Sequence, residues 1–249
     1  MDVHRSSIPG QPLKFGDCSV TFIVDTSKAI RGLEPLVAKS IQSLISKQLE
    51  NPSGTFKYRL YGAGYRSGWL DVQRRVVPSL FISDSHTTRL CDAFQSVYQE
   101  INYDERNVIV ALRLSPNDDS GAVSCERRTT HFLGHSTNQV LYVGANHDTN
   151  FVSTRYGVPR THTLVCGVPT LEGAIESCSN SISRLRVLAD LYNAKRAASV
   201  TAFDSEDRQK AFPEGWRGNE EFHNKIGKLD DFHNAENWKL NAAHQRFAI

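Results

Sequence analysis

Short apolar runs alternate along this chain with stretches in which apolar residues recur every three or four positions. The runs are rich in β-branched residues and predict strands at 18–24, 56–60, 76–82, 107–114, 139–143 and 163–166. The stretches with helical spacing predict helices at 33–45, 87–101, 124–134 and 171–192. Strands that alternate with amphipathic helices indicate a mostly parallel sheet covered on both faces, so we expect a three-layer, doubly wound α/β domain. Ligands of such folds bind at the carboxyl ends of the strands.

The composition divides the chain into three parts. Residues 1–14 are polar and predict a flexible leader, whereas residues 15–195 hold all the predicted strands and helices and form the α/β domain. From residue 196 to residue 249, aromatic side chains lie between many charges. Because a purely solvating tail contains few aromatics, we expect a helical C-terminal extension that packs on the domain or on another subunit. Its candidate partner-binding residues are Trp216, Phe222, Phe232 and Trp238.

The overall composition excludes some classes of partner. The 249 residues carry a net charge of +2, with 39% apolar and 22% charged residues, so a nucleic-acid partner is not expected. No apolar run has the length of a membrane span, and the leader lacks the apolar block of a secretory signal, so no membrane partner is expected. The five cysteines show no CxxC spacing, and we expect reduced thiols in a cytoplasmic protein. Four of them lie inside apolar patterns and are expected in the core, namely Cys18, Cys91, Cys166 and Cys178.

Oxygen-bearing side chains follow the first predicted strand. Asp25 and Ser27 come directly after a buried run, at the edge where α/β sheets bind their ligands. Carboxylate and hydroxyl oxygens are the ligands that magnesium prefers. At this point the chain resembles the von Willebrand factor type A family, whose metal motif at this place is Asp-x-Ser-x-Ser. The resemblance to bacterial members continues, in order and spacing, through residues 86–93, 104–110, 140–150, 156–159 and 170–173.

The resemblance implies a metal site formed by Asp25, Ser27, Thr88 and Ser115, but two positions depart from the family pattern. The third motif residue is Ala29, which has no side-chain oxygen, and Ser115 stands where the family has an aspartate. The site thereby loses a hydroxyl and one of two carboxylates, and the affinity of oxygen sites for divalent ions depends on ligand charge. We therefore expect a degenerate site with no cofactor, or at most weak binding of Mg²⁺ or Mn²⁺. Asp25 and Ser27 also suit a structural role as caps of the following helix.

Other motifs give no support to a catalytic function, and we expect no enzyme. The chain has no GxSxG nucleophile elbow and no P-loop. The Gly62-Ala63-Gly64 segment lacks the third glycine of a dinucleotide site and predicts a turn with close backbone approach. His131 and His135 share a helical face, but a zinc site needs two further ligands, so we expect surface histidines. Three arginines lie near Trp69 in the sequence: Arg66, Arg74 and Arg75. They predict a solvated hairpin with a half-buried Trp, or else a surface for an acidic partner or RNA.

These observations predict a non-catalytic protein–protein interaction or assembly domain of the von Willebrand factor A type, with a largely lost metal site. Its partner is another protein, or a second copy of the chain bound through the C-terminal extension. Two alternatives stay open. One is metal-dependent ligand binding in which Ser115 and waters complete the metal shell. The other is a structural or assembly protein, for example of a virus or a secretion apparatus.

Overall fold

The computed structural model describes residues 16–52, 54–64, 68–70, 82, 88–103, 105–114, 123–135, 138–145, 155–187 and 194–212. Its strands are β1 (Cys18–Asp25), β2 (Phe56–Ala63), β3 (Gly68–Leu70), β4 (Asn107–Arg113), β5 (Gln139–Ala145) and β6 (Thr163–Cys166). Its α-helices are α1 (Glu34–Glu50), α2 (Leu90–Glu100), α3 (Val123–Gly134), α5 (Leu171–Arg186), α6 (Ala194–Thr201) and α7 (Ser205–Ala211). Three short 3₁₀ helices are η1 (Lys28–Ile30), η2 (Arg160–His162) and η3 (Val168–Thr170).

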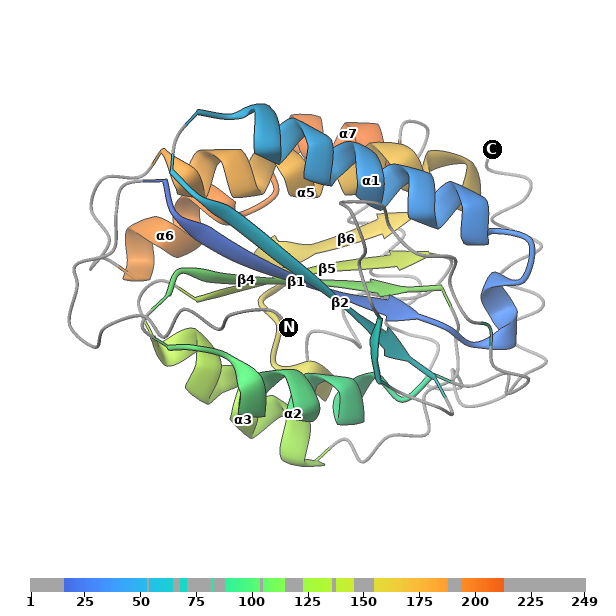
Figure 1. Cartoon of the computed structure of the whole chain (residues 1–249), viewed down its shortest axis with the longest axis horizontal. Coiled ribbons are helices and arrows are strands. Elements are labelled where there is room, and N and C mark those ends of the chain that lie inside the picture. The colour runs from blue at the N-terminus through green and yellow to red at the C-terminus, as the bar shows by residue number, and fades with distance from the viewer. Residues whose placement is uncertain are drawn as a thin grey trace, which may run out of the picture.

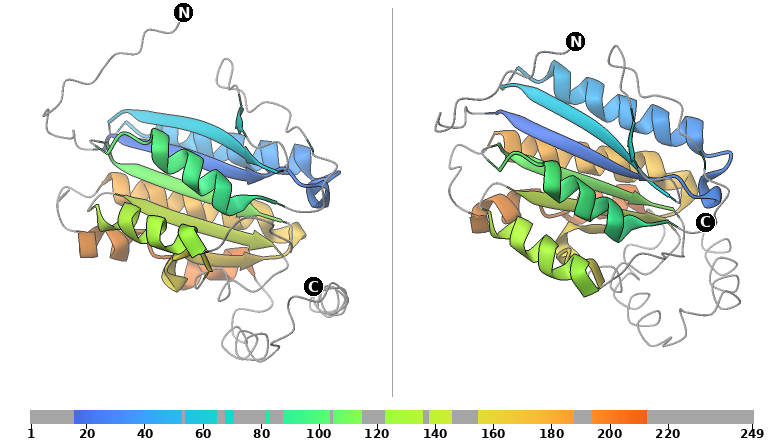
Figure 2. Two further views of the ribbon diagram at one scale, coloured as in Figure 1. Left: turned by 90° about the horizontal axis from the view of Figure 1, so that it is seen from below. Right: turned by 60° about the horizontal axis from the view of Figure 1, so that its bottom comes forward.

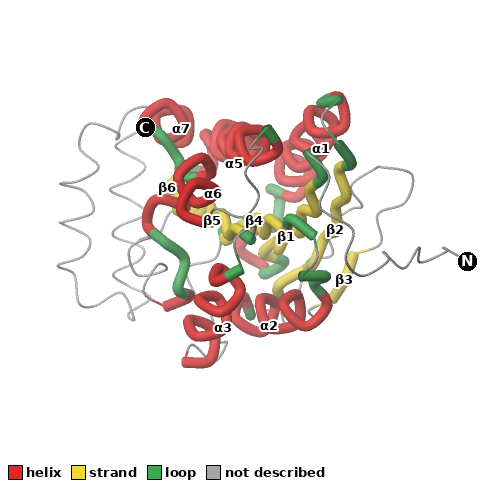
Figure 3. The backbone as a smooth tube through the Cα atoms, turned by 90° about the vertical axis from the view of Figure 1, so that its left-hand side faces the viewer, coloured by secondary structure: helices red, strands yellow, loops and turns green. Residues whose placement is uncertain are grey.

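The strands form one six-stranded sheet in the order β3-β2-β1-β4-β5-β6. All neighbouring pairs are parallel except β2 and β3, which are antiparallel. Helices α1, α5 and α7 lie on one side of the sheet and α2 and α3 on the other (Figures 1 and 3). The predicted three-layer, mostly parallel α/β fold is therefore confirmed.

Strand alternation explains how one sheet serves two cores. In β1, Phe22 and Val24 pack into the core beneath α1 and α5, whereas Ile23 packs into the core above α2 and α3. All three side chains are fully buried. A strand covered on both faces must be apolar at nearly every position, which is why β1, β4 and β5 read as continuous apolar runs. The views in Figure 2 show the helices of both layers running along the strands.

The antiparallel edge strand β3 agrees with the hairpin predicted around Trp69. Gly68–Leu70 pairs with the preceding strand β2, with Trp69 opposite Tyr61, and Trp69 is half-buried as expected. Of the strand predicted at 76–82, only Ile82 lies within the described residues, and it is outside any strand. The three residues of β3 are too few to show the alternation on which strand prediction relies.

The packed core continues beyond residue 195, where the sequence analysis placed the end of the α/β domain. Phe203 and Ala211 are buried in the core beneath α1 and α5. Helix α7 lies against α5 so closely that a Cβ atom on Gly173 would be 2.7 Å from the carbonyl oxygen of Lys210. On the same helix pair, Arg184 Nη2 lies 2.7 Å from the buried carboxylate of Asp207. Helices α6 and α7 are thus part of the domain, and residues 213–249 lie outside the described residues.

Helix α7 also covers the outer edge of the sheet. Arg208 donates from Nη1 to the carbonyl oxygen of Thr163 at 3.1 Å, and thereby occupies an acceptor at the start of β6. An unpaired strand edge invites pairing with another chain, and a covering helix with a cationic side chain prevents this. In the described part of the chain, no helix combines the length and the apolar character needed to cross a membrane.

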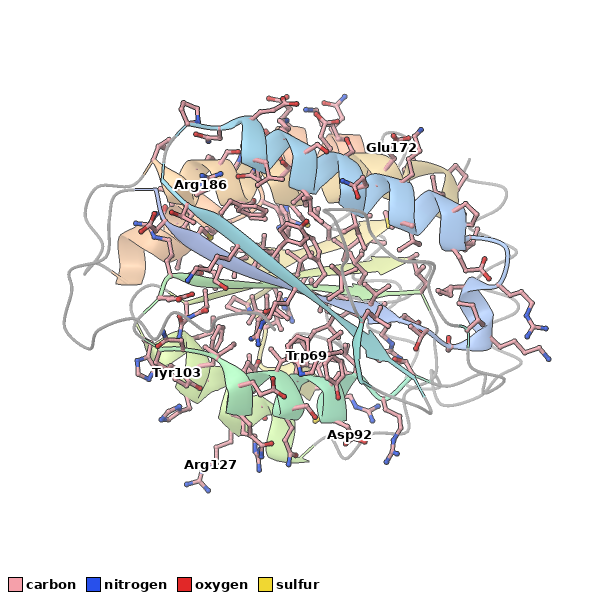
Figure 4. All side chains as sticks on the ribbon, viewed as in Figure 1. Trp69, Asp92, Tyr103, Arg127, Glu172 and Arg186 are labelled. Carbon is pink, nitrogen blue, oxygen red and sulfur yellow. The ribbon has the colours of Figure 1, made fainter. Side chains whose placement is uncertain are left out.

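A buried arginine connects α5 to the segment before β1 and to the end of α1. Arg186, at the end of α5, is 0% exposed (labelled in Figure 4). Its Nε donates to the carbonyl oxygen of Gly16 at 3.0 Å, and its Nη1 donates to the carbonyl and side-chain oxygens of Gln48 at 2.5 and 3.1 Å. The guanidinium therefore satisfies acceptors at the start of the domain and in the last turn of α1, where carbonyls have no helical partner.

Candidate functional site

The candidate site lies at the carboxyl ends of β1, β2 and β4. Strand β1 has β2 on one side and β4 on the other, so the order of the sheet reverses there. Helix α1 follows β1 on one side of the sheet, whereas α2 leads into β4 on the other side (Figure 1). At such a switch point the connecting segments diverge and leave room for a ligand above the strand ends.

Asp25 lies at the carboxyl end of β1, between the ends of β2 and β4. It ends β1 and is 1% exposed. Its Oδ1 accepts a hydrogen bond from the backbone N–H of Ser27 at 2.8 Å, and its Oδ2 accepts one from the backbone N–H of Leu114 at 3.0 Å. The first bond shapes the turn into η1, and the second joins the ends of β1 and β4. Two N–H donors stabilise the charged form of a buried carboxylate.

A second group of hydrogen bonds meets at the end of β2. The carbonyl oxygen of Ala63, which is opposite Asp25 in the sheet register, accepts from the N–H of Thr26 at 3.2 Å and from Thr88 Oγ1 at 2.8 Å. Thr88 lies before α2 and is fully buried. Because its hydroxyl proton is engaged by the carbonyl, its oxygen can only accept from, or coordinate, another group.

The glycine-rich end of β2 allows this close approach. A Cβ atom on Gly64 would be 2.4 Å from Thr26 Oγ1, well inside van der Waals contact. The expected close approach at Gly62-Ala63-Gly64 is confirmed, since Gly64 lets the end of β2 lie against the turn after β1. The expected turn is not, because Gly62 and Ala63 belong to β2.

The structure brings three of the four predicted metal-site residues to one edge of the sheet. Asp25, Ser27 and Thr88 are all buried there, and Ala29 lies in η1. Ser115 lies outside the described residues, as do the predicted partner-binding residues Trp216, Phe222, Phe232 and Trp238.

The described residues at this edge offer a divalent cation few charged ligands. Of the predicted site residues that the structure describes, only Asp25 is a carboxylate, and each of its oxygens already accepts a backbone N–H. A carboxylate oxygen can accept more than one bond, so these bonds do not by themselves prevent coordination of a cation. The shortage is one of negative charge, because Ser27 and Thr88 are neutral. Across the described part of the chain, no three His, Cys, Asp or Glu side chains lie together in a metal-binding arrangement.

A charged residue that was not predicted from the sequence lies near this edge. Arg113 ends β4, and its side chain is only 2% exposed. Its Nη1 lies 3.5 Å from Tyr156 Oη, at the outer limit of a hydrogen bond. The signal was present in the sequence, because a charge inside a run predicted to be buried on both faces needs a specific electrostatic partner.

Other candidate residues have structural roles. Trp69 is half-buried and donates from Nε1 to Glu100 Oε1 at 2.8 Å, while the guanidinium of Arg59 lies 4.3 Å from the centre of its ring. This arrangement, labelled at Trp69 in Figure 4, fastens β3 to β2 and α2. Arg66, Arg74 and Arg75 lie outside the described residues. His131 and His135 are exposed, as expected. All five cysteines are buried, and none of them forms a disulfide bond.

The comparison with solved structures identifies the fold. Two structures of proximal thread matrix protein 1 from the mussel byssus are similar to this chain. The first has 12% identity and a TM-score of 0.51, covering 65% of this chain and 44% of that protein. The second, described as having a zinc occupied MIDAS motif, has 13% identity and a TM-score of 0.50, covering 68% and 46%.

A von Willebrand factor type A protein from Catenulispora acidiphila has 11% identity and a TM-score of 0.45, covering 68% of this chain and 43% of its own. The chain thus spans less than half the length of each of these proteins. No family model and no curated protein matches the sequence. The likeness to proximal thread matrix protein 1 supports the expected von Willebrand factor A-like fold, and at this level of identity it concerns the fold alone.

Proposed function

We propose that this chain is a non-catalytic protein–protein interaction and assembly domain that works without a resident divalent cation. The observation that carries the proposal is the hydrogen bonding of the Asp25 carboxylate. Asp25 ends β1, and both its carboxylate oxygens accept hydrogen bonds from backbone N–H groups. This is the arrangement expected of a carboxylate that organises the turn after β1 and joins β1 to β4.

Without a firmly held ion, the site has no metal to which a carboxylate of the partner could coordinate. The affinity must then come from buried apolar and aromatic contacts, which dominate most protein interfaces. The aromatic residues of the C-terminal segment, Trp216, Phe222, Phe232 and Trp238, are our candidates for these contacts, including contacts between two copies of the chain.

The buried histidine His162 is itself poorly suited to acid–base catalysis. His162 lies between two threonine hydroxyls, with Nδ1 3.0 Å from Thr161 Oγ1 and Nε2 2.9 Å from Thr201 Oγ1. Burial lowers the pKa of His162 from 6.5 to about 4, which makes the imidazole a weak base at neutral pH. With an exposure of 3%, it is also inaccessible to a substrate.

Metal-dependent ligand binding is the second candidate, because Asp25, Ser27 and Thr88 still converge at the edge. The two functions differ in calorimetric titration of the full chain with Mg²⁺ and Mn²⁺. We expect no binding tighter than the millimolar range. Micromolar binding that is abolished by Asp25→Ala would establish the metal-dependent function instead.

The assembly part of the proposal is tested by light scattering of the full chain. We expect a concentration-dependent mass above that of the monomer, equal in EDTA and in Mg²⁺. A full-length variant with the four C-terminal aromatic residues changed to serine should have a lower mass. A chain that is monomeric at every concentration, or that loses its mass increase in EDTA, contradicts this part.

A further inference from the structure

Arg113 is a buried charge within an otherwise apolar strand. The preceding residues of β4, Val108 to Leu112, are all buried and apolar, and Arg113 itself is 2% exposed. A guanidinium stays protonated in proteins at any ordinary pH, so this charge cannot be removed by titration. Burial of a permanent charge is strongly unfavourable unless negative charge or polar groups lie nearby.

The register of the sheet places Arg113 beside Asp25. Val24 pairs with Leu112 in the parallel β1–β4 ladder, so Asp25 and Arg113 occupy the next positions of the two strands. Both follow the face of Ile23 and Ala111, which pack in the core above α2 and α3. The carboxylate of Asp25 also reaches over the end of β4, because its Oδ2 accepts the N–H of Leu114 at 3.0 Å.

These facts limit the distance between the two charges. The N–H that binds Asp25 belongs to the peptide that follows the Cα atom of Arg113, so the carboxylate lies within about 6 Å of that Cα by standard bond lengths. An arginine side chain reaches about 7 Å from its Cα at most, which is a consequence of the same bond lengths. The guanidinium is therefore within roughly 13 Å of the carboxylate, in surroundings where screening by water is weak.

We propose that Arg113 supplies at this strand edge the positive charge that a divalent ion would otherwise supply, and that it thereby excludes divalent cations. The inference rests on the proposed metal-independent function and names the residue responsible for it. The guanidinium attracts the single negative charge of Asp25 and repels a doubly charged ion twice as strongly. The proposal concerns the field of the guanidinium at the site and needs no direct contact with Asp25.

A consequence is that the site keeps its charge balance whatever the supply of divalent ions. Asp25 then accepts its hydrogen bonds from the N–H groups of Ser27 and Leu114 both with and without divalent ions in solution. A turn that is ordered without an ion presents the same surface to a partner in the presence or absence of Mg²⁺.

The test compares Mn²⁺ binding by the full-length protein and three full-length variants. Arg113→Met removes the charge and keeps much of the apolar volume, and we expect it to lower the Mn²⁺ dissociation constant by at least about tenfold. Arg113→Lys keeps the charge and should bind Mn²⁺ no better than the unmodified protein. The gain should disappear in Arg113→Met/Asp25→Ala. Circular dichroism of each variant establishes that it is folded.

If Arg113→Met alone does not fold, Arg113→Met/Asp25→Asn should recover folding, because both charges are then removed together. Failure of that double variant to recover it would overturn the inference. An Arg113→Met protein that folds and binds Mn²⁺ no better than the unmodified chain would also overturn it. The proposed function fails by a different result, namely micromolar Mn²⁺ binding by the unmodified protein.

Discussion

His162 makes the stability of this domain depend on pH in a predictable direction. The residue joins η2 to the end of α6, since Nε2 lies 2.9 Å from Thr201 Oγ1, and Thr201 Oγ1 donates in turn to Gln139 Oε1 at 3.1 Å. Burial disfavours the charged imidazolium and lowers the pKa of His162 from 6.5 to about 4, although a backbone hydrogen bond to Ala198 opposes the shift. At neutral pH the imidazole is therefore uncharged in the folded protein.

The sign and the size of the effect follow from proton linkage. Between pH 6.5 and about 4 the unfolded chain binds a proton at this position and the folded chain does not. Acid therefore favours unfolding, and the stability is fully present above pH 6.5 and is lost as the pH falls toward 4. A shift of this size corresponds to about 3 kcal/mol, since each pKa unit is worth about 1.4 kcal/mol.

The measurement is urea denaturation of the full chain at several values between pH 7.5 and 4. Carboxylates titrate over part of the same range, so the informative quantity is the difference from His162→Gln, whose amide can still donate and accept hydrogen bonds. We expect the unmodified protein to lose about 3 kcal/mol more than the variant over this range. If both proteins lose the same free energy of unfolding, His162 is not buried as an uncharged residue, and the argument is refuted.

Two further predictions concern packing. Arg186→Met should lower the free energy of unfolding, measured by urea denaturation, by about 2–4 kcal/mol, because buried carbonyls lose their donor. The exposed control Arg127→Met should change this free energy by less than about 0.5 kcal/mol. Equal effects of the two substitutions would contradict the role assigned to Arg186. Gly173→Ala should lower the melting temperature by a few degrees, despite the higher helix propensity of alanine, because the added methyl group meets the Lys210 carbonyl. Gly134→Ala, where nothing lies within 4 Å, is its control in differential scanning calorimetry, and a stabilised Gly173→Ala protein would show that α7 does not dock as described.

Local patterns in the sequence were sufficient to predict the layers of this fold. The run Cys18–Val24 predicted β1 to within one residue at its end, and β6 was predicted at Thr163–Cys166, where it lies. These predictions succeed because the apolar residues of a buried strand or an amphipathic helix follow a pattern that is visible within a short stretch of sequence. The position of Asp25 at the end of the first strand was readable for the same reason.

Contacts between distant segments could not be read from such patterns. The bond from Leu114 N–H to Asp25 spans 89 positions, and the link between Thr201 and Gln139 spans 62. Whether Arg113 is a surface charge or a neighbour of Asp25 depends on which strands pair and in which register, and that is decided by the packing of all the layers together. The sequence by itself determined the kind of each element and the edge where a site must lie. Only the tertiary structure decided which charges share that edge, because electrostatic interaction depends on distance in space and not on separation along the chain.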